Sequence, residues 1–252
     1  MVKIEFSEVS DFDFKDMTLV DMHCHTTYSD GLDSAETLIQ RAKQLKIGLS
    51  ITDHNTVRGT LKIGTSLFSI PGIEVTSLDS IDFLFYFYTL KDLIEFHDRY
   101  VKDNVLKFKG FNYRKLNIET LHLLDLARNY NAVVVLPHPF TMRPKNSFIF
   151  MSKHRELLNY VDGIEVINSI MTLESNSKAI TWANGLDLAA TGGSDAHLVK
   201  HLGNVVTASY ANTVEDFLDT ILKKKNFVVG TPVRGVERLK TKISIFRSNY
   251  QW

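Results

Sequence analysis

The chain has 252 residues, of which 44% are hydrophobic and 23% charged, and this composition excludes a disordered, collagen-like or low-complexity protein. Its 29 basic and 29 acidic residues give a formal net charge of zero, which excludes a global positive field that would draw the protein onto nucleic acid or an anionic membrane. The single cysteine excludes an intramolecular disulfide. Because the sequence also shows no signal peptide and no bilayer-length apolar run, we expect a cytoplasmic protein.

Short apolar runs alternate with longer amphipathic runs along the chain. The short runs predict strands at Thr18–His23, Gly48–Thr52, Pro71–Thr76, Ile81–Tyr88, Ala132–Leu136, Gly163–Asn168, Leu186–Thr191 and Val205–Ala208. The amphipathic runs predict helices at Ser34–Lys46, Gly59–Leu67, Asp92–Tyr100, Ile118–Tyr130, Leu173–Asn184 and Val214–Lys224.

This alternation predicts a parallel sheet with helices outside it. Roughly seven or eight such units suit a (β/α) barrel, so we expect a single α/β domain over residues 1–252. Two segments have no clear period. The basic and aromatic segment 101–116 predicts a loop, a lid or a helical insertion, and the basic tail from about residue 230 has no predicted element.

A histidine pair ends the first predicted strand. Alternation along a strand points His23 and His25 to one face and Cys24 to the other, so the two histidines can approach one metal ion. Two unrelated histidines in a surface strand would give the same spacing. The pair therefore indicates a metal site only in combination with metal-type residues at the ends of the other strands.

Metal-type side chains also accompany later strands. Asp53 and His54 follow Gly48–Thr52, where a turn with a helix cap would give the same pair. Glu74 lies within an apolar strand, so its carboxylate is either paired, bound to a metal or, on an edge strand, turned to water. His138, between two prolines, ends Ala132–Leu136 either as a ligand or as a core histidine.

The last such motif repeats the spacing of the first. Asp195 and His197 stand two residues apart after Gly192-Gly193, and the glycines let the backbone pass close to a ligand. In a parallel barrel the strand ends share one face, so these side chains would form a bowl that holds two or three divalent ions. With one cysteine there is no thiolate cage, and the His and carboxylate ligands favour Zn, Mn or Fe.

The motifs H-x-H-T-x-x-S-D-G, T-D-H, G-x-E, P-H-P and G-S-D-A-H occur in this order between about residues 20 and 203. In this the sequence resembles the PHP (polymerase and histidinol phosphatase) family, in particular its smaller metal-dependent phosphoesterases. The resemblance implies a distorted seven-stranded (β/α) barrel with a trinuclear metal centre.

The resemblance also implies how the ligands divide among the ions. One ion would be held by His23, His25, Glu74 and Asp195. Glu74 would bridge to a second ion bound by His138, and a third would be held by Asp30, His54 and His197.

One position departs from the family pattern. Relatives usually carry a histidine for the second ion in the strand after G-x-E, and Asp82 stands there in this sequence. A carboxylate can still bind a metal, so we expect Asp82 to be a ligand. The alternative is a weaker or differently metallated second site.

Further roles are assigned around this centre. Glu165 and Asn168, in a G-x-E-x-x-N pattern, are expected to orient the ligating histidines or to face the substrate. Asp53 and His201 are the candidates for the acid that protonates the leaving oxygen. Arg58, Arg143 and Lys145 are the candidates for phosphate binding, with solvated surface as the alternative.

Three functions are compatible with these residues. The first is hydrolysis of a small phosphomonoester by a metal-activated hydroxide. The second is an exonuclease or oligonucleotide phosphodiesterase that takes short single-stranded nucleic acid, because segment 101–116 mixes basic and aromatic residues. The third is a non-catalytic, metal-binding accessory module, for which Asp82 is the feature in favour. The neutral net charge favours the small substrate.

Overall fold

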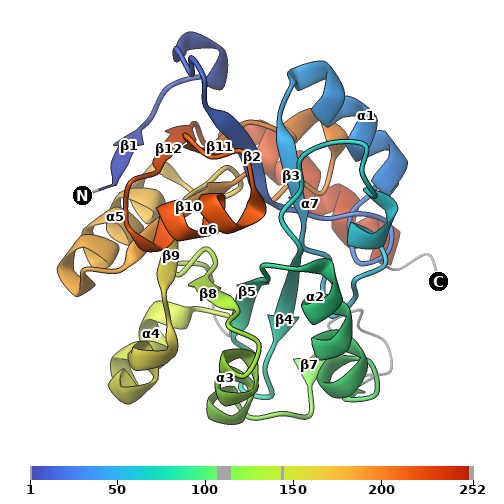
Figure 1. Ribbon diagram of the computed structural model, residues 1–252, viewed down its shortest axis with the longest axis vertical. Helices are drawn as coiled ribbons and strands as arrows, with labels where there is room; N and C mark the ends of the chain where they lie inside the picture. Colours follow the sequence, from blue (N-terminus) through green and yellow to red (C-terminus); the bar gives the residue numbers. More distant parts are fainter. Residues whose placement is uncertain (1, 107–114, 143–144, 250–252) are drawn as a thin grey trace.

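The computed structural model describes residues 2–106, 115–142 and 145–249, in which the larger strands form two five-stranded sheets (Figure 1). The first sheet has the order β1-β12-β11-β2-β3, with β1 Lys3–Glu5, β12 Phe227–Gly230, β11 Val205–Ser209, β2 Thr18–Cys24 and β3 Gly48–Ile51. The second has the order β10-β9-β8-β5-β4, with β10 Ala189–Gly193, β9 Gly163–Asn168, β8 Val133–Leu136, β5 Asp82–Tyr86 and β4 Gly72–Thr76.

Helices surround these sheets in Figure 1. They are α1 Ala35–Leu45, α2 Leu90–Phe96, α3 Thr120–Arg128, α4 Ser147–Lys153, α5 Leu173–Leu186, α6 Val214–Leu222 and α7 Gly235–Asn249. Among the described residues no helix combines the length and the apolar character needed to cross a membrane.

The sheets are mixed rather than parallel. β5 runs antiparallel to both of its neighbours, β4 and β8, and β11 runs antiparallel to β2 and β12. The prediction of a parallel sheet is therefore wrong for these strands. The reason for β5 is its connection, because the few residues between Thr76 and Asp82 suffice for a hairpin but not for a crossover. Asp82 consequently pairs with Thr76, and the start of β5 lies at the end of β4.

No continuous ladder joins the two sheets within the described ranges, so the predicted closed seven-stranded barrel is not observed and the fold is a mixed α/β one. Isolated bridges connect the sheets instead. Cys24 pairs with Ala196, and His54 pairs with Glu74. Both bridges lie within the metal-type motifs, so the sheets meet where these motifs are.

Several predicted elements change. The expected helix at 59–67 is a single 3-10 turn, Thr60–Lys62, and the helix expected at 92–100 starts at Leu90 and passes into a π turn at His97–Val101. Segment 101–116 contributes the paired strands β6 Val105–Leu106 and β7 Lys115–Leu116, and its central residues 107–114 lie outside the described residues.

Helices α4 and α7 and the outer strands β1 and β12 were not predicted. In α7 the apolar residues Val236, Leu239 and Ile243 are exposed. These three residues are three and four positions apart, which is the spacing of one helical face, so the sequence carried a signal for this helix that our prediction missed.

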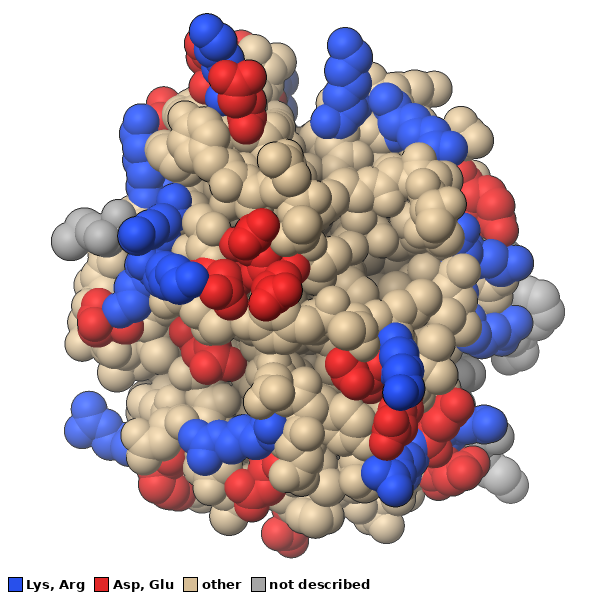
Figure 2. All heavy atoms as spheres, in the orientation of Figure 1, with Lys and Arg blue, Asp and Glu red and all other residues tan. Residues whose placement is uncertain are grey.

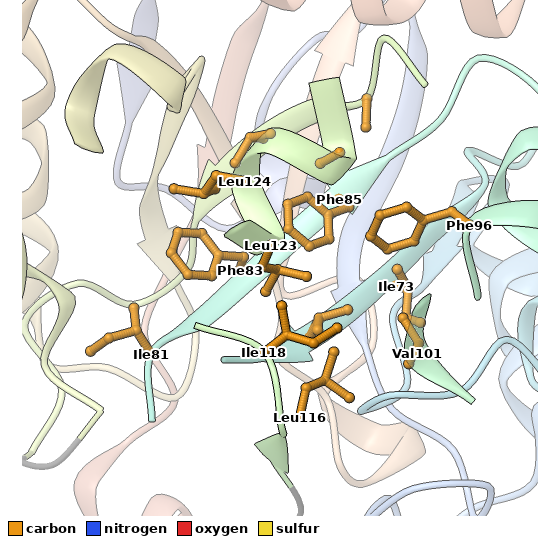
Figure 3. Packing of buried hydrophobic residues seen from close by; sticks show 14 of the residues in the cluster. Ile73, Ile81, Phe83, Phe85, Phe96, Val101, Leu116, Ile118, Leu123 and Leu124 are labelled. Atoms are coloured by element: carbon orange, nitrogen blue, oxygen red, sulfur yellow. The ribbon is translucent and has the colours of Figure 1, made fainter. Parts of the chain in front are cut away.

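The core beside β4 and β5 combines aliphatic side chains with several buried phenylalanine rings. Figure 3 shows Phe83 and Phe85 of β5 beneath α3, with Phe96 of α2 next to them. The rings of Phe83 and Phe85 are 6.0 Å apart and stacked. Leu84 and Tyr86 point to the opposite face and are also fully buried. Burial on both faces explains why β5 reads as a continuous apolar run.

Glycine is required where β10 passes β2. A Cβ on Gly193 would lie 2.4 Å from the Cβ of His23 and 2.6 Å from its backbone nitrogen. Neither position can move without shifting the strand. By contrast, a Cβ on Gly185 of α5 would meet no atom within 4 Å.

Gly193→Ala should therefore push the two strands apart and lower the free energy of unfolding by about 1–3 kcal/mol or more. Gly185→Ala is the matched control and should raise it by about 0.5–1 kcal/mol, because alanine suits a helix interior better. Denaturant unfolding of both variants measures the difference. Equal stabilities would contradict the close approach at Gly193.

Candidate metal centre

The strand ends bring the predicted metal-binding residues into one cluster. β2 carries His23, β4 carries Glu74, and the residues that follow β3, β8 and β10 supply His54, His138 and Asp195. The cluster contains all the predicted ligands, namely His23, His25, Asp30, His54, Glu74, Asp82, His138, Asp195 and His197. Cys24 lies in a separate apolar cluster, as the alternation along β2 predicts.

Four donor atoms surround one point at the bottom of the cluster. His23 Nε2 lies 3.0 Å from His25 Nε2, 3.4 Å from Glu74 Oε2 and 3.6 Å from Asp195 Oδ1. His25 Nε2 lies 3.3 Å from each of the same two carboxylate oxygens. Ligands about 2.0–2.1 Å from a tetrahedral metal lie about 3.3–3.4 Å from one another. These five distances are therefore close to those between the ligands of a tetrahedral metal ion.

A second group lies at the more exposed side of the cluster. Asp30 Oδ2 is 3.2 Å from His197 Nε2 and 3.7 Å from His54 Nε2. His25 Nδ1 lies 3.8 Å from the other oxygen of Asp30. The structure thus brings together the residues that the resemblance assigns to the third ion, and His25 and Asp195 connect them to the first group.

Glu74 connects these groups to a third. Its Oε2 contacts His23, His25 and His54, whereas its Oε1 lies 3.3 Å from His138 Nε2. His54, Glu74 and Asp82 form a further set of three donors close enough for one ion. Asp82, however, already pairs with Lys145, whose Nζ lies 2.8 Å from Oδ2.

The donor set fits divalent metal ions. Glu74 Oε1, Asp30 Oδ1 and His54 Nδ1 are buried and have no hydrogen-bond partner among the described residues. Buried polar atoms are nearly always paired, because leaving one unpaired costs its full desolvation energy. A metal ion would satisfy these atoms and neutralise the buried carboxylates.

The electrostatics of the metal-free cluster support this. Burial by itself would raise the pKa of Glu74 and Asp195, but the neighbouring histidines hold both well below their usual range. Burial lowers the pKa of His197, but Asp30 and Asp195 outweigh it and raise the value to about 9. Protons on histidine thus balance the carboxylates, and metal binding at neutral pH has to displace them.

Glu165 and Asn168 hold the ligands from β9. Glu165 Oε1 lies 2.9 Å from His23 Nδ1, and its Oε2 accepts hydrogen bonds from the His138 backbone N–H and from Asn168 Nδ2. Asn168 Nδ2 also donates to Asp195 Oδ2 at 3.1 Å. A proton on Nδ1 of His23 leaves Nε2 as a lone pair aimed into the cluster.

The two candidate acids contact other partners. Asp53 accepts hydrogen bonds from Thr26 N, Thr26 Oγ1 and Ser29 Oγ, so it holds the loop that follows β2. His201 Nε2 lies 3.0 Å from Thr241 Oγ1 on α7, and in the described part of the chain no hydrogen bond or ion pair joins its ring to the cluster. Their catalytic roles stay predictions.

Of the candidate phosphate-binding residues, Lys145 alone is placed at the cluster among those described. The Arg58 guanidinium lies over the ring of Tyr28, 4.5 Å from its centroid. Arg143 lies outside the described residues.

Sequence reasoning missed Asp21. Its carboxylate is fully buried and accepts hydrogen bonds from the backbone N–H groups of His23, Ser194 and Gly203, so it ties β2 to the segment after β10. Burial raises the pKa of Asp21 to about 6. Its position two residues before His23, on the same face of the strand, was the available signal.

Comparison with known proteins agrees with the motifs. A family model described as PHP-associated matches residues 174–226. The solved structure of a two-domain protein from Bacteroides vulgatus, containing a predicted PHP-like metal-dependent phosphoesterase, superposes with a TM-score of 0.60 at 15% identity. The match covers 97% of this chain and 74% of that one. The chain is thus similar to PHP-type proteins in segment 174–226 and in its fold.

Two other proteins are similar to the chain in sequence. An uncharacterised protein of Methanocaldococcus jannaschii, MJ0417, is 27% identical over 236 residues, which cover 92% of this chain and 86% of that protein. The 5′-3′ exoribonuclease Rnm of Salmonella typhimurium is 40% identical over 68 residues. That match covers 24% of this chain and 23% of the exoribonuclease.

Removing the charge on Glu165 should weaken metal binding. Glu165→Gln cannot accept all the hydrogen bonds that hold His23 and His138, and metal affinity should fall about 10–100-fold. Competition with a chromogenic chelator measures the affinity. Glu174→Gln, which changes only an exposed ion pair with Lys178, is the control and should bind as the parent does. Equal affinities for both variants would contradict the orienting role.

Asp21 should make stability depend on pH. Its folded pKa of about 6 lies above its ordinary value of 3.8, so its contribution is fully present below about pH 3.8 and is lost as the pH rises through 6. The difference between the two pKa values corresponds to a loss of about 3 kcal/mol in the free energy of unfolding. In the metal-free chain Asp21→Asn should remove this loss, measured as the change in unfolding free energy between pH 4 and 7. Parallel pH curves for the two proteins would contradict it.

Proposed function

We propose that the chain hydrolyses a small phosphomonoester with two or three divalent metal ions, Zn, Mn or Fe, held by the His and carboxylate cluster. The observation that carries the proposal is the set of four donor atoms from His23, His25, Glu74 and Asp195 at metal-ligand spacing. The likeness to a PHP-like metal-dependent phosphoesterase supports the reaction class. The single cysteine supports a cytoplasmic location.

Bound divalent ions would lower the pKa of a water molecule and neutralise the oxygens of the phosphoryl group. The chain's own contribution is a fixed geometry. Glu165 holds a proton at Nδ1 of His23, and Asn168 fixes the Asp195 carboxylate. Donors that are locked in this way lose little free energy to reorganisation during the reaction.

Exposure defines the side from which the substrate approaches. The side chains of His23, His25 and Glu74 are at most 1% exposed, whereas Asp30 is 27% and His54 is 20% exposed. Lys145 is 28% exposed beside Asp82 and offers a cation at the open side. A phosphate that enters there meets Lys145 before it reaches the buried donors.

The distribution of charge favours a small substrate. On the face shown in Figure 2, lysine and arginine side chains are interspersed with acidic ones, and acidic side chains gather over α6. A protein that tracks a nucleic acid backbone usually presents a continuous basic groove. The charge pattern of this face therefore supports a compact phosphate ester.

An exonuclease or oligonucleotide phosphodiesterase is the second candidate. The likeness to an exoribonuclease over 68 residues supports it. A groove of about 1010 Å³ between α4 and α5 also supports it. Phe140, Phe148 and Trp182 line part of this groove, and Phe140 is two residues from His138 in the sequence. Aromatic side chains stack with bases. Segment 101–116 adds no argument, because its centre lies outside the described residues.

A non-catalytic accessory module is the third candidate. It would keep the metal-binding donors and lack turnover. The predicted ligands gather in one cluster, and Asp82 remains the feature in its favour, because it pairs with Lys145. Full metal occupancy without hydrolysis of any phosphoester would favour this candidate.

Phosphate release tests the proposal. With a chromogenic monoester and a nucleoside monophosphate, release should require Mn²⁺ or Zn²⁺ and stop when a chelator is added. Asp195→Asn should reduce kcat at least about 100-fold, because it removes a charged donor of the first group. His122→Ala, at an exposed position of α3, is the control and should retain activity.

The substrates separate the candidates. Release from monoesters and not from oligonucleotides supports the phosphatase. Hydrolysis confined to oligonucleotides would overturn it in favour of the nuclease, and normal turnover by Asp195→Asn would overturn the assignment of the centre.

A further inference from the structure

Lys145 and Asp82 form an ion pair at the edge of the cluster, in which Asp82 is buried and Lys145 is partly exposed. Asp82 is 1% exposed and is the first residue of β5. Its Oδ1 accepts a hydrogen bond from Thr76 Oγ1 at 2.6 Å, and its Oδ2 lies 2.8 Å from Lys145 Nζ. One oxygen of the carboxylate thus contacts a hydroxyl group and the other contacts an ammonium group.

The same carboxylate belongs to a group of potential metal ligands. His54, Glu74 and Asp82 offer three donor atoms close to one another. The Lys145 ammonium therefore lies at the edge of the space that an ion bound to Asp82 would need. Its charge also reaches His54: burial lowers the pKa of His54, and Lys145 adds to the lowering.

A divalent ion and an ammonium group compete for this place. An ion that Asp82 coordinates at about 2.0–2.2 Å would lie within a few ångströms of the Lys145 nitrogen. Like charges at that distance repel strongly in a site with little water. The Lys145 ammonium already pairs with the Asp82 carboxylate, so the negative charge of Asp82 is compensated without a metal.

The other two donor groups have no such competitor among the described residues. The tetrahedral set around His23 and His25 contains only His and carboxylate donors. In the part of the chain that the structure describes, Asp30 forms ion pairs with histidines and none with a lysine or an arginine. Metal sites thus remain in two of the three places.

We propose that the Lys145 ammonium replaces one divalent ion at Asp82, so that the centre holds two metal ions and one fixed organic cation. The inference rests on the proposed metal-dependent function and specifies its cofactor content. Lys145 then neutralises Asp82 and remains partly exposed toward the entering phosphate. Its role is that of a built-in third cation rather than a surface lysine.

Metal stoichiometry tests the proposal without reference to activity. Each protein is saturated with Mn²⁺, freed of unbound ion by gel filtration and analysed by mass spectrometry for metal per chain. The parent should hold two ions. Lys145→Met keeps the apolar stem, removes the charge and should hold three, because Asp82 becomes available. Asp82→Asn should still hold two.

Controls make the count specific. The double variant Lys145→Met with Asp82→Asn should return to two ions, which shows that the additional ion depends on Asp82. Lys153→Met, at an exposed position of α4, should hold two. Circular dichroism and the Mn²⁺-induced rise in melting temperature verify that each variant is folded and binds metal.

Several results would overturn the inference. Three ions in the parent and two in Asp82→Asn would show that Asp82 is a metal ligand despite Lys145. Two ions in a folded Lys145→Met would show that the lysine does not exclude a metal. Fewer than two ions in the parent would overturn the metal centre itself. Loss of hydrolysis with the expected counts would affect the proposed function alone.

Discussion

The buried charge of Glu74 is the constraint on which the site depends. Its carboxylate lies in the middle of β4, and its two oxygens contact four histidines that come from β2 and from the segments after β2, β3 and β8. An isolated ionised carboxylate in such a place would be very costly. The strands around β4 must therefore present cationic or metal-bound groups, and this requirement explains why the two sheets meet at this point.

Side chains outside the cluster hold the potential metal ligands in position. Glu165 and Asn168 on β9 fix His23 and Asp195, while Asp21 ties β2 to the backbone after β10. Gly193 allows the two strands to approach closely enough for these contacts. A rigid support of this kind suits a site whose donors must keep metal-ligand spacing with little reorganisation.

The proposed number of cations in the centre depends on the direction of one strand. Because β5 runs antiparallel to β4, its first residue, Asp82, joins the cluster at the end of β4. The chain segment before α4 then brings Lys145 to the same carboxylate. Asp82 thus lies beside a lysine whose charge balances its own.

The sequence by itself identified the residues that the structure brings together in one cluster. Strict spacing, as in His23 and His25, fixes which side chains share a face, since this depends only on local backbone geometry. The family resemblance supplied the grouping of the ligands, and the strands β4, β8 and β9 were located nearly to the residue. The tertiary structure alone decided the mixed direction of the sheets, the meeting of two sheets without a closed barrel, and the pairing of Asp82 with Lys145. These features arise from contacts between segments far apart in the chain, and such contacts leave no period in the sequence.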